Sequence, residues 1–210
     1  APVTEPEKTF EEVLDEHSVS IQVNGQWQTF PNAKAAEEAS YEEYKANLRR
    51  NAQNFHITDE HLGEGGPKAK FQANVNAIRL LKELEVAGQQ ASPEQQEVLS
   101  RYVGWGGLSD AFDPEKPAWA LEYAQLKELL TPEEYAAARS STLNAHYTSP
   151  TVIQAIYEAV DRMGFETGNI LEPSMGVGNF FGMLPEEMRN SRLYGVELDP
   201  VSGRIAKQLY

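Results

Sequence analysis

Two short apolar segments, each ending in acidic residues, constrain the fold of this chain most strongly. The first, Asn169–Glu172, predicts a buried strand that runs into the glycine-rich stretch 173–182. About twenty residues downstream, the segment 192–198 predicts a second buried strand that ends in carboxylates. Together they predict a turn that lets the backbone approach a nucleoside ligand, and an acid placed to hold its ribose.

The composition is that of an ordinary globular chain without cysteine. Of its 210 residues, 40% are hydrophobic and 24% are charged, which is enough for the core of one or two domains. The absence of cysteine excludes disulfides, thiolate metal sites and cysteine nucleophiles. No apolar run reaches the roughly eighteen residues that a membrane span needs, so we expect a cytoplasmic protein without a membrane partner. The first residues lack the features of a signal peptide, and we expect an internal piece of a longer polypeptide.

The charge is strongly negative and lies mostly at the front of the chain. The formal net charge is −14, and residues 1–66 hold thirteen of the 32 acidic residues but five of the 18 Lys and Arg residues. Phosphate backbones are bound mainly by Lys and Arg, so tight duplex binding by this chain alone is not expected. Any contact with DNA is expected to use parts of the parent protein outside this chain.

Four regions are expected along the chain. Residues 1–16 are acidic and contain two prolines, which predicts a flexible tail. Over 17–66 we expect a hairpin, a helix and a glycine-rich linker, because apolar and polar residues alternate over 19–30 around a central Asn-Gly pair. A helical domain follows over 67–143, and residues 144–210 carry the two strands and the glycine-rich stretch between them.

Helix signals dominate the middle of the chain. Residues 33–54 predict a charged helix, and apolar residues then recur on one face of a second helix that ends near Gly88. The members of this face are Phe71, Val75, Ile78, Leu81 and Leu84. Ser92 and Thr131 each begin a capping sequence with proline at the first helical position, and 119–130 supplies a further helix. A small helical bundle is the economical interpretation.

Two features of the helical region have two interpretations each. The stretch 102–108 has three glycines around Trp105. It either caps a helix at Gly104 and packs Trp105 into the core, or forms a loop that folds over a ligand. His56 and His61 lie near two acidic residues, but their spacing resembles no zinc motif, so solvated or capping histidines are expected rather than a metal site.

A helix with an apolar face is predicted to begin at Pro150. Thr148 or Ser149 is its N-cap, and Pro150 occupies the first helical position. A helix N-terminus has free N–H groups and a partial positive charge, which suits the carboxylate of an amino-acid-like cofactor. The alternative is that Thr148 only caps the helix.

The acid at the end of the first strand separates two classes of ligand. Dinucleotide folds seat a pyrophosphate directly after this strand, where the carboxylate of Glu172 would repel it. S-adenosylmethionine has no phosphate and presents an ammonium and a sulfonium, so a carboxylate is favourable near its methionine end. The glycine spacing agrees, because Gly176, Gly178 and Gly182 are one residue more widely spaced than the dinucleotide pattern.

The second strand supplies the acid expected at the ribose. Glu197 can accept hydrogen bonds from both ribose hydroxyls, as acids at this position do in nicotinamide enzymes. Asp199 precedes Pro200 at the start of the next helix, so it either caps that helix or contacts the cofactor.

Three segments, 144–150, 171–180 and 194–200, resemble the first three motifs of amino-group DNA methyltransferases of the N6-adenine type, in the order that this family uses. More widely, the stretch 54–208, about three-quarters of the chain, is similar to the large methylase–helicase proteins of conjugative elements and phages. The resemblance implies that S-adenosyl-L-methionine is the cofactor. The residues that it implies in cofactor binding are Tyr147, Thr148, Glu172, Pro173, Ser174, Gly176, Gly178, Asn179, Glu197 and Asp199.

The match to the family has two departures. Many relatives have adjacent Thr-Pro where this chain has Thr148-Ser149-Pro150, so the hydroxyl that touches the cofactor is left open. The family's catalytic motif, an Asn or Asp followed by Pro-Pro and an aromatic residue, is absent from this sequence. We therefore assign no catalytic residue and expect this chain alone to be inactive.

The predicted fold class is α/β, with a helical N-terminal region followed by the first part of a doubly wound, Rossmann-like methyltransferase sheet. Such a sheet has about seven strands, and the residues after His146 supply about two, so the sheet is expected to be truncated. Its exposed edge predicts either loose order after about residue 165 or self-association through that edge.

The leading hypothesis is the N-terminal part of an S-adenosylmethionine-dependent DNA adenine-N6 methyltransferase, supplying cofactor-binding motifs. The first alternative is a non-catalytic protein-interaction module of a mobile-element helicase protein with a vestigial cofactor loop. A nicotinamide oxidoreductase is disfavoured by Glu172 and by the glycine spacing. Binding of S-adenosylhomocysteine or of NADH separates these hypotheses.

Overall fold

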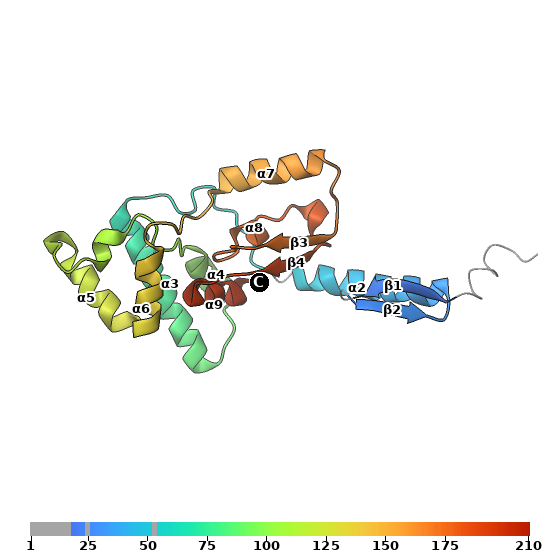
Figure 1. Ribbon diagram of the computed structural model, residues 1–210, viewed down its shortest axis with the longest axis horizontal. Helices are drawn as coiled ribbons and strands as arrows, with labels where there is room; N and C mark the ends of the chain where they lie inside the picture. The colour runs from blue at the N-terminus through green and yellow to red at the C-terminus, as the bar shows by residue number, and fades with distance from the viewer. Residues whose placement is uncertain (1–17, 24–25, 52–53) are drawn as a thin grey trace, which may run out of the picture. The chain divides into compact units, whose positions relative to one another are not determined.

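The computed structural model describes residues 18–23, 26–51 and 54–210 (Figure 1). The chain divides into two compact units, residues 1–52 and residues 53–210. Figure 1 labels the helices and strands of each unit. Within the described ranges, no helix has both the length and the apolar character that crossing a membrane requires.

The first unit is a β-hairpin with one helix. Strand β1 (Val19–Val23) pairs antiparallel with β2 (Gln26–Phe30), and α2 (Ala33–Asn51) packs against both strands. Among the described residues of this unit, the buried apolar side chains are those of Val23 and Ala36. The two strands and the helix form where the alternating and charged patterns predict them.

Parts of the sequence predictions for this unit lie outside the described residues. These parts are the acidic tail over 1–16, the turn at 24–25 and the end of the predicted helix at 52–53. The charged pattern predicts that this helix runs to residue 54, and the structure describes it as far as Asn51.

Helices make up the first part of the second unit. In chain order they are α3 (Pro67–Ala87), α4 (Pro93–Ser100), the 3₁₀ turns η1 (Ser109–Phe112) and η2 (Pro117–Trp119), α5 (Ala120–Leu129) and α6 (Pro132–Ser141). Both predicted capping boxes are present, because the Ser92 hydroxyl accepts from the N–H of Gln95 and the Thr131 hydroxyl accepts from the N–H of Glu134. Helix α3 ends at Ala87 with Gly88 as its C-cap, near the predicted end of the helix.

The core of the second unit is built on the apolar face of α3. Five side chains at three- and four-residue spacing are buried there, as predicted, namely Phe71, Val75, Ile78, Leu81 and Leu84. Trp105 lies in the same core with its indole edge-on to the rings of Phe71 and Phe112. The last helix of the chain also contributes, through Val201, Ile205 and Leu209.

The stretch 102–108 confirms one half of its first predicted interpretation and contradicts the other half. Trp105 is buried in the core, as the first interpretation predicts. Gly104 does not cap α4, because that helix ends at Ser100 with Arg101 as its C-cap. The turn at Gly104 instead follows the helix by several residues, and its position is set by contacts with other elements.

Two parallel strands follow the helical part. Helix α7 (Pro150–Arg162) leads to β3 (Asn169–Glu172), which pairs with β4 (Arg192–Gly195). The remaining elements are α8 (Asn179–Gly182), the 3₁₀ turn η3 (Glu186–Met188) and α9 (Pro200–Leu209). On one face of the sheet, Ile170 and Leu193 pack against the cluster that contains Ile153 of α7.

Strand β4 is shorter than its predicted range of 192–198. Its partner β3 ends at Glu172, where the chain turns into the glycine-rich stretch, so the residues after Gly195 have no strand beside them. Two hydrogen bonds still tie the ends together, from the N–H of Val196 to the carbonyl of Glu172 and from the N–H of Met175 to the carbonyl of Val196. The fold is mixed α/β, and its two parallel strands are compatible with a doubly wound sheet without establishing one.

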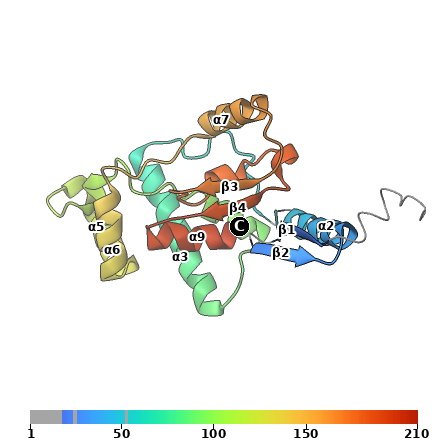
Figure 2. The same cartoon turned by 45° about the vertical axis from the view of Figure 1, so that its right-hand side comes forward.

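Helix α9 joins the strands to the helical part. It packs against α3 and α4, and Figure 2 shows it where it crosses α3. An ion-pair network supports the junction, because the Glu134 carboxylate accepts from Lys82 Nζ at 2.7 Å and from Arg204 Nη1 at 2.8 Å. Since these residues come from α6, α3 and α9, the network holds the helical part to the end of the chain.

Candidate functional site

A cleft of about 530 Å³ lies at the carboxyl ends of β3 and β4. Its walls come from the end of α6, from the segment that leads into α7, and from the loops that follow the two strands. Eight of the ten predicted cofactor-binding residues line it, namely Tyr147, Thr148, Glu172, Ser174, Gly176, Asn179, Glu197 and Asp199. Parallel pairing explains the meeting of residues from both loops, because it brings the carboxyl ends of the two strands to one edge of the sheet.

Glu197 connects the two loops. Its Oε2 accepts a hydrogen bond from the N–H of Gly176 at 2.7 Å, and its Oε1 accepts from the N–H of Asp199 at 2.7 Å. A carboxylate has about four acceptor positions, so each oxygen keeps a lone pair for a ligand hydroxyl. The carboxylate expected at the ribose is therefore held in one orientation by backbone groups.

Asp199 has the capping role that is one of its two predicted alternatives. Its Oδ2 accepts from the N–H of Ser202 at 2.8 Å and from the Ser202 hydroxyl at 2.5 Å. Asp199 also lines the cleft. Capping and proximity to a ligand are thus compatible at this position.

Tyr147 lies between two glycine turns. Gly104 has φ of +67° and Gly176 has φ of +56°, and a Cβ on either would lie within 2.7 Å of an atom of the Tyr147 ring. The Tyr147 hydroxyl is 2.9 Å from Oγ of Ser202, and burial raises the pKa of Tyr147 far above its usual range. The two glycine turns therefore approach the ring near Cε2 and near Cε1, and its hydroxyl stays protonated.

Thr148 and Ser149 have different surroundings. Ser149 is the N-cap residue of α7 by its backbone conformation, but its side chain makes no capping hydrogen bond within the part of the chain that the structure describes. Thr148 is half-buried and lines the cleft, whereas Ser149 is exposed and does not. Of the two hydroxyls that the sequence leaves open, that of Thr148 is the one beside the cleft.

Glu172 is a partly buried acid at the end of β3. Burial raises the pKa of its carboxyl above the usual value, and a hydrogen bond from the backbone of Ser174 partly opposes this effect. The ionised carboxylate is therefore less stable here than in water, and a cationic ligand would favour it.

Two predicted residues lie outside the cleft lining. Pro173 is exposed, and Gly178 is the N-cap residue of the short helix α8. A Cβ on Gly178 would overlap the ring of Tyr210, so this glycine makes room for a core side chain rather than for the cleft. Whether either contacts a ligand stays a prediction.

The cleft also contains residues that sequence reasoning missed. Ser140 and Ser141 come from the end of α6, and Ser202 comes from the first turn of α9. Polar residues near a helix end usually face solvent, so the two α6 serines gave no signal. Ser202 could have been found, because it lies three residues after the predicted cap Asp199, where a capped N–H is expected.

The charged side chains that line the cleft are acidic. Its lining contains three carboxylates, those of Glu172, Glu197 and Asp199, and neither Lys nor Arg. A phosphate-bearing ligand would meet repulsion here, whereas an ammonium or sulfonium would be attracted. The three carboxylates can accept hydrogen bonds and attract a cationic group.

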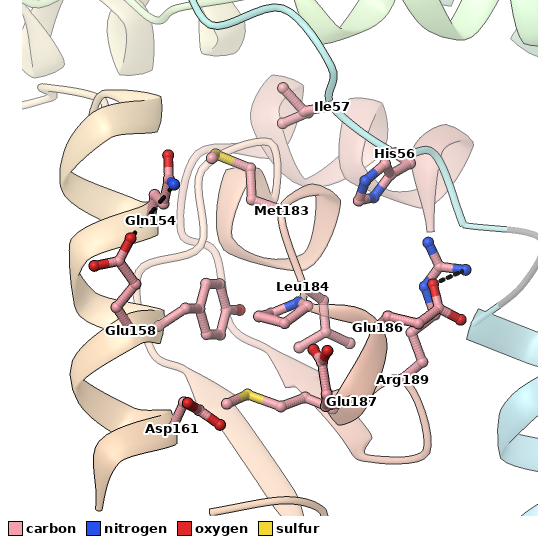
Figure 3. A pocket seen from close by; sticks show the side chains of 13 residues that line it. His56, Ile57, Gln154, Glu158, Asp161, Met183, Leu184, Glu186, Glu187 and Arg189 are labelled. Carbon is pink, nitrogen blue, oxygen red and sulfur yellow. Dashed lines mark hydrogen bonds and ion pairs between the residues drawn. The ribbon is translucent and has the colours of Figure 1, made fainter.

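A second cavity, of about 520 Å³, lies between α7 and the segment 183–189 that contains η3 (Figure 3). Glu158 and Asp161 project from α7, Glu186 and Glu187 from η3, and His56 from the segment that precedes α3. Glu158 accepts from Gln154 at 3.4 Å, and Glu186 pairs with Arg189 at 2.7 Å. Within the described ranges, no group of three or more His, Asp or Glu side chains is arranged to hold a metal ion.

Two curated proteins are similar to this chain. It is 26% identical over 148 residues to the Defense against restriction protein B of Escherichia phage P1, a match that covers 70% of this chain and 5% of that protein. It is 46% identical over 43 residues to the Type II methyltransferase M.CvrRI of Paramecium bursaria Chlorella virus XZ-6E, covering 20% of this chain and 11% of that protein. The chain therefore spans a small part of the length of either relative. No family model and no solved structure matches it.

Proposed function

We propose that this chain supplies the S-adenosyl-L-methionine-binding part of a DNA adenine-N6 methyltransferase. The observation that carries the proposal is the cleft at the carboxyl ends of β3 and β4, where a glycine turn is bonded to Glu197 and Lys and Arg are absent from the lining. The proposal assigns cofactor binding, and not methyl transfer, to the residues of the cleft.

Each wall of the cleft has a role in this proposal. Glu197 accepts hydrogen bonds from the ribose hydroxyls with the lone pairs that its backbone partners leave free. Glu172 attracts the cationic methionine end, and Tyr147 and Thr148 border the same end. The bound cofactor would supply an electrophilic methyl group on its sulfonium.

The exposed face of the sheet supports a larger parent fold. Leu171 and Tyr194 lie opposite each other in the strand register, and they are 62% and 41% exposed. Parallel sheets are nearly always covered on both faces, so further elements of a doubly wound sheet would cover these side chains in the whole protein. The same apolar face would promote self-association of this chain in isolation.

The names of the two relatives support the choice of reaction. One is named as a methyltransferase and the other as a protein of defence against restriction. The order of the three sequence motifs resembles that of the N6-adenine family, which gives adenine as the target. DNA would be contacted through parts of the whole protein outside this chain, because this chain has a net charge of −14.

Calorimetric titration with S-adenosylhomocysteine tests the proposal. The wild-type chain is expected to bind, with ligand raised to millimolar concentration, and Glu197→Ala is expected to lose at least tenfold in affinity because two charge-assisted hydrogen bonds disappear. Glu158→Ala, in the second cavity, removes the same charge and is the matched control with unchanged affinity. NADH is expected to bind at least tenfold more weakly because its phosphates meet three carboxylates.

Three outcomes would contradict the proposal. Absence of wild-type binding would favour an interaction module with a vestigial loop. Equal losses in Glu197→Ala and Glu158→Ala would indicate attraction by net charge alone. Tighter binding of NADH than of S-adenosylhomocysteine would favour an oxidoreductase.

A further inference from the structure

The buried side chain of Asn74 bonds to a turn that borders the cleft. Asn74 lies on α3 and has no exposed surface. Its Nδ2 donates to the carbonyl of Gly104 at 2.6 Å, and its Oδ1 accepts from the N–H of Val103 at 2.9 Å. A buried amide that is satisfied on both sides by one turn fixes the position of that turn.

The turn that Asn74 holds touches the ring of Tyr147. A Cβ on Gly104 would lie 2.5 Å from Cε2 of this ring, and a Cβ on Gly176 would lie 2.7 Å from Cε1. The ring is therefore wedged between a turn of the helical part and the glycine turn after β3. Its hydroxyl contacts Ser202, which in turn bonds to Asp199.

We propose that Asn74 is a positioning residue for ligand binding in the cleft. It fixes the 103–104 turn, the turn fixes the Tyr147 ring, and the ring sets the wall against which the amino-acid end of the ligand packs. This inference rests on the proposed function of the cleft. It makes the helical part a component of the ligand site rather than an independent neighbour.

Only an amide side chain provides both hydrogen bonds. Asn74→Asp would put a second acceptor against the Gly104 carbonyl, and Asn74→Leu would leave the Val103 N–H and the Gly104 carbonyl without their partner. Either change frees the turn to move. The Tyr147 ring would then lose one of the two surfaces that hold it.

The test measures the affinity for S-adenosylhomocysteine at a temperature where every variant is folded. Asn74→Leu is expected to bind about tenfold more weakly than wild type, by loss of a preorganised wall. Leu84→Ala removes a buried side chain from the same helix without touching the turn, so it controls for lost stability and should bind within twofold of wild type. If Asn74→Leu does not fold, Gly104→Ala displaces the same turn from the side of the ring.

A double-mutant cycle on ligand affinity distinguishes positioning of the Tyr147 ring from a general effect of Asn74 on stability. In a Tyr147→Ala background, Asn74→Leu should change the affinity by less than twofold, because the ring through which it acts is gone. Equal losses in both backgrounds, or unchanged affinity in Asn74→Leu, would overturn the inference.

The ring position can also be measured without ligand. With 3-fluorotyrosine at position 147, the fluorine resonance should shift in Asn74→Leu and stay unchanged in Leu84→Ala. If the wild-type chain bound no S-adenosylhomocysteine, the proposed function would fail and the ligand-positioning inference with it. The resonance would still report whether Asn74 holds the ring, which separates the two failures.

Discussion

The cleft and the second cavity are nearly equal in volume and both are lined by acidic residues, yet their carboxylates are held in different ways. In the cleft, Glu197 bonds to the backbone of Gly176, 21 residues away in sequence. In the second cavity, Glu158 pairs with Arg162 and Glu186 with Arg189, within one helical turn each. Local bonds occur in both cavities, for example between Glu197 and the N–H of Asp199. The bond from Gly176 to Glu197 joins segments far apart in sequence, and this bond, rather than charge or volume, marks the cleft as preorganised.

The strongest test of this comparison uses two ion pairs to arginine. Glu134→Ala should lower the free energy of unfolding by about 2 kcal/mol, because Lys82 loses its carboxylate partner and Arg204 keeps only Glu85. Glu186→Ala removes the exposed local partner of Arg189 and should cost less than about 0.5 kcal/mol. Urea denaturation measures both, and a loss below about 1 kcal/mol for Glu134→Ala would contradict the comparison.

The ionisation of Glu134 should also make the stability of the protein depend on pH. Burial alone would raise the pKa of Glu134, but Lys82, the Thr131 N–H and Arg204 bring it below its usual value of 4.5. An acid with a depressed pKa in the fold stabilises the protein above its unfolded pKa, and this contribution is lost as the pH falls through the folded pKa. Below about pH 4.5, wild type should therefore lose more stability than Glu134→Ala does.

The next test compares two glycines with positive φ. Gly176→Ala should weaken binding of S-adenosylhomocysteine at least tenfold, because the new Cβ would displace the Tyr147 ring. Gly164→Ala also has a left-handed backbone, with φ of +83°, but open space around the new Cβ. Both variants should lose about 1 kcal/mol of stability from backbone strain, and Gly164→Ala alone should keep its affinity. If calorimetry gave the same affinity for Gly176→Ala and Gly164→Ala, the glycine turn at Gly176 would not be part of the ligand site.

Glu172 allows a test with effects of opposite sign. Its pKa is raised by burial, so its ionised form opposes folding above the folded pKa, and this penalty disappears as the pH falls toward the unfolded value. At pH 7, Glu172→Gln should slightly raise Tm and weaken S-adenosylhomocysteine binding about fivefold, by loss of attraction to the ligand ammonium. Glu158→Gln should change neither quantity. A simultaneous fall in Tm and affinity would show that Glu172 has a structural role instead.

Local sequence patterns predicted the helices and strands of this chain more fully than they predicted the contacts between them. The apolar periodicity of α3, the capping boxes at Ser92 and Thr131, and the parallel strands followed from residue spacing and local chemistry. The meeting of Glu172 and Glu197 at one edge also followed, because parallel strands have their carboxyl ends together.

Contacts between elements far apart in the chain could not be predicted from the sequence. Asn74 looks like an ordinary polar residue in an amphipathic helix, and its bonds to the 103–104 turn, about thirty residues away, depend on how α3 and α4 pack. The end of β4 at Gly195 was missed for a similar reason, because a strand ends where its neighbour turns away and not where its own apolar pattern stops.

The smallest expected effect separates two adjacent hydroxyls beside the cleft. Thr148 lines the cleft, and Ser149 is exposed at the start of α7. Thr148→Ala should weaken S-adenosylhomocysteine binding about threefold, the loss expected for one neutral hydrogen bond. Ser149→Ala should bind as wild type does and should leave Tm nearly unchanged, because the Ser149 side chain makes no capping hydrogen bond to the described residues. The reverse pattern in calorimetry would assign the ligand contact to Ser149, and the segment before α7 would then have to turn when the ligand binds.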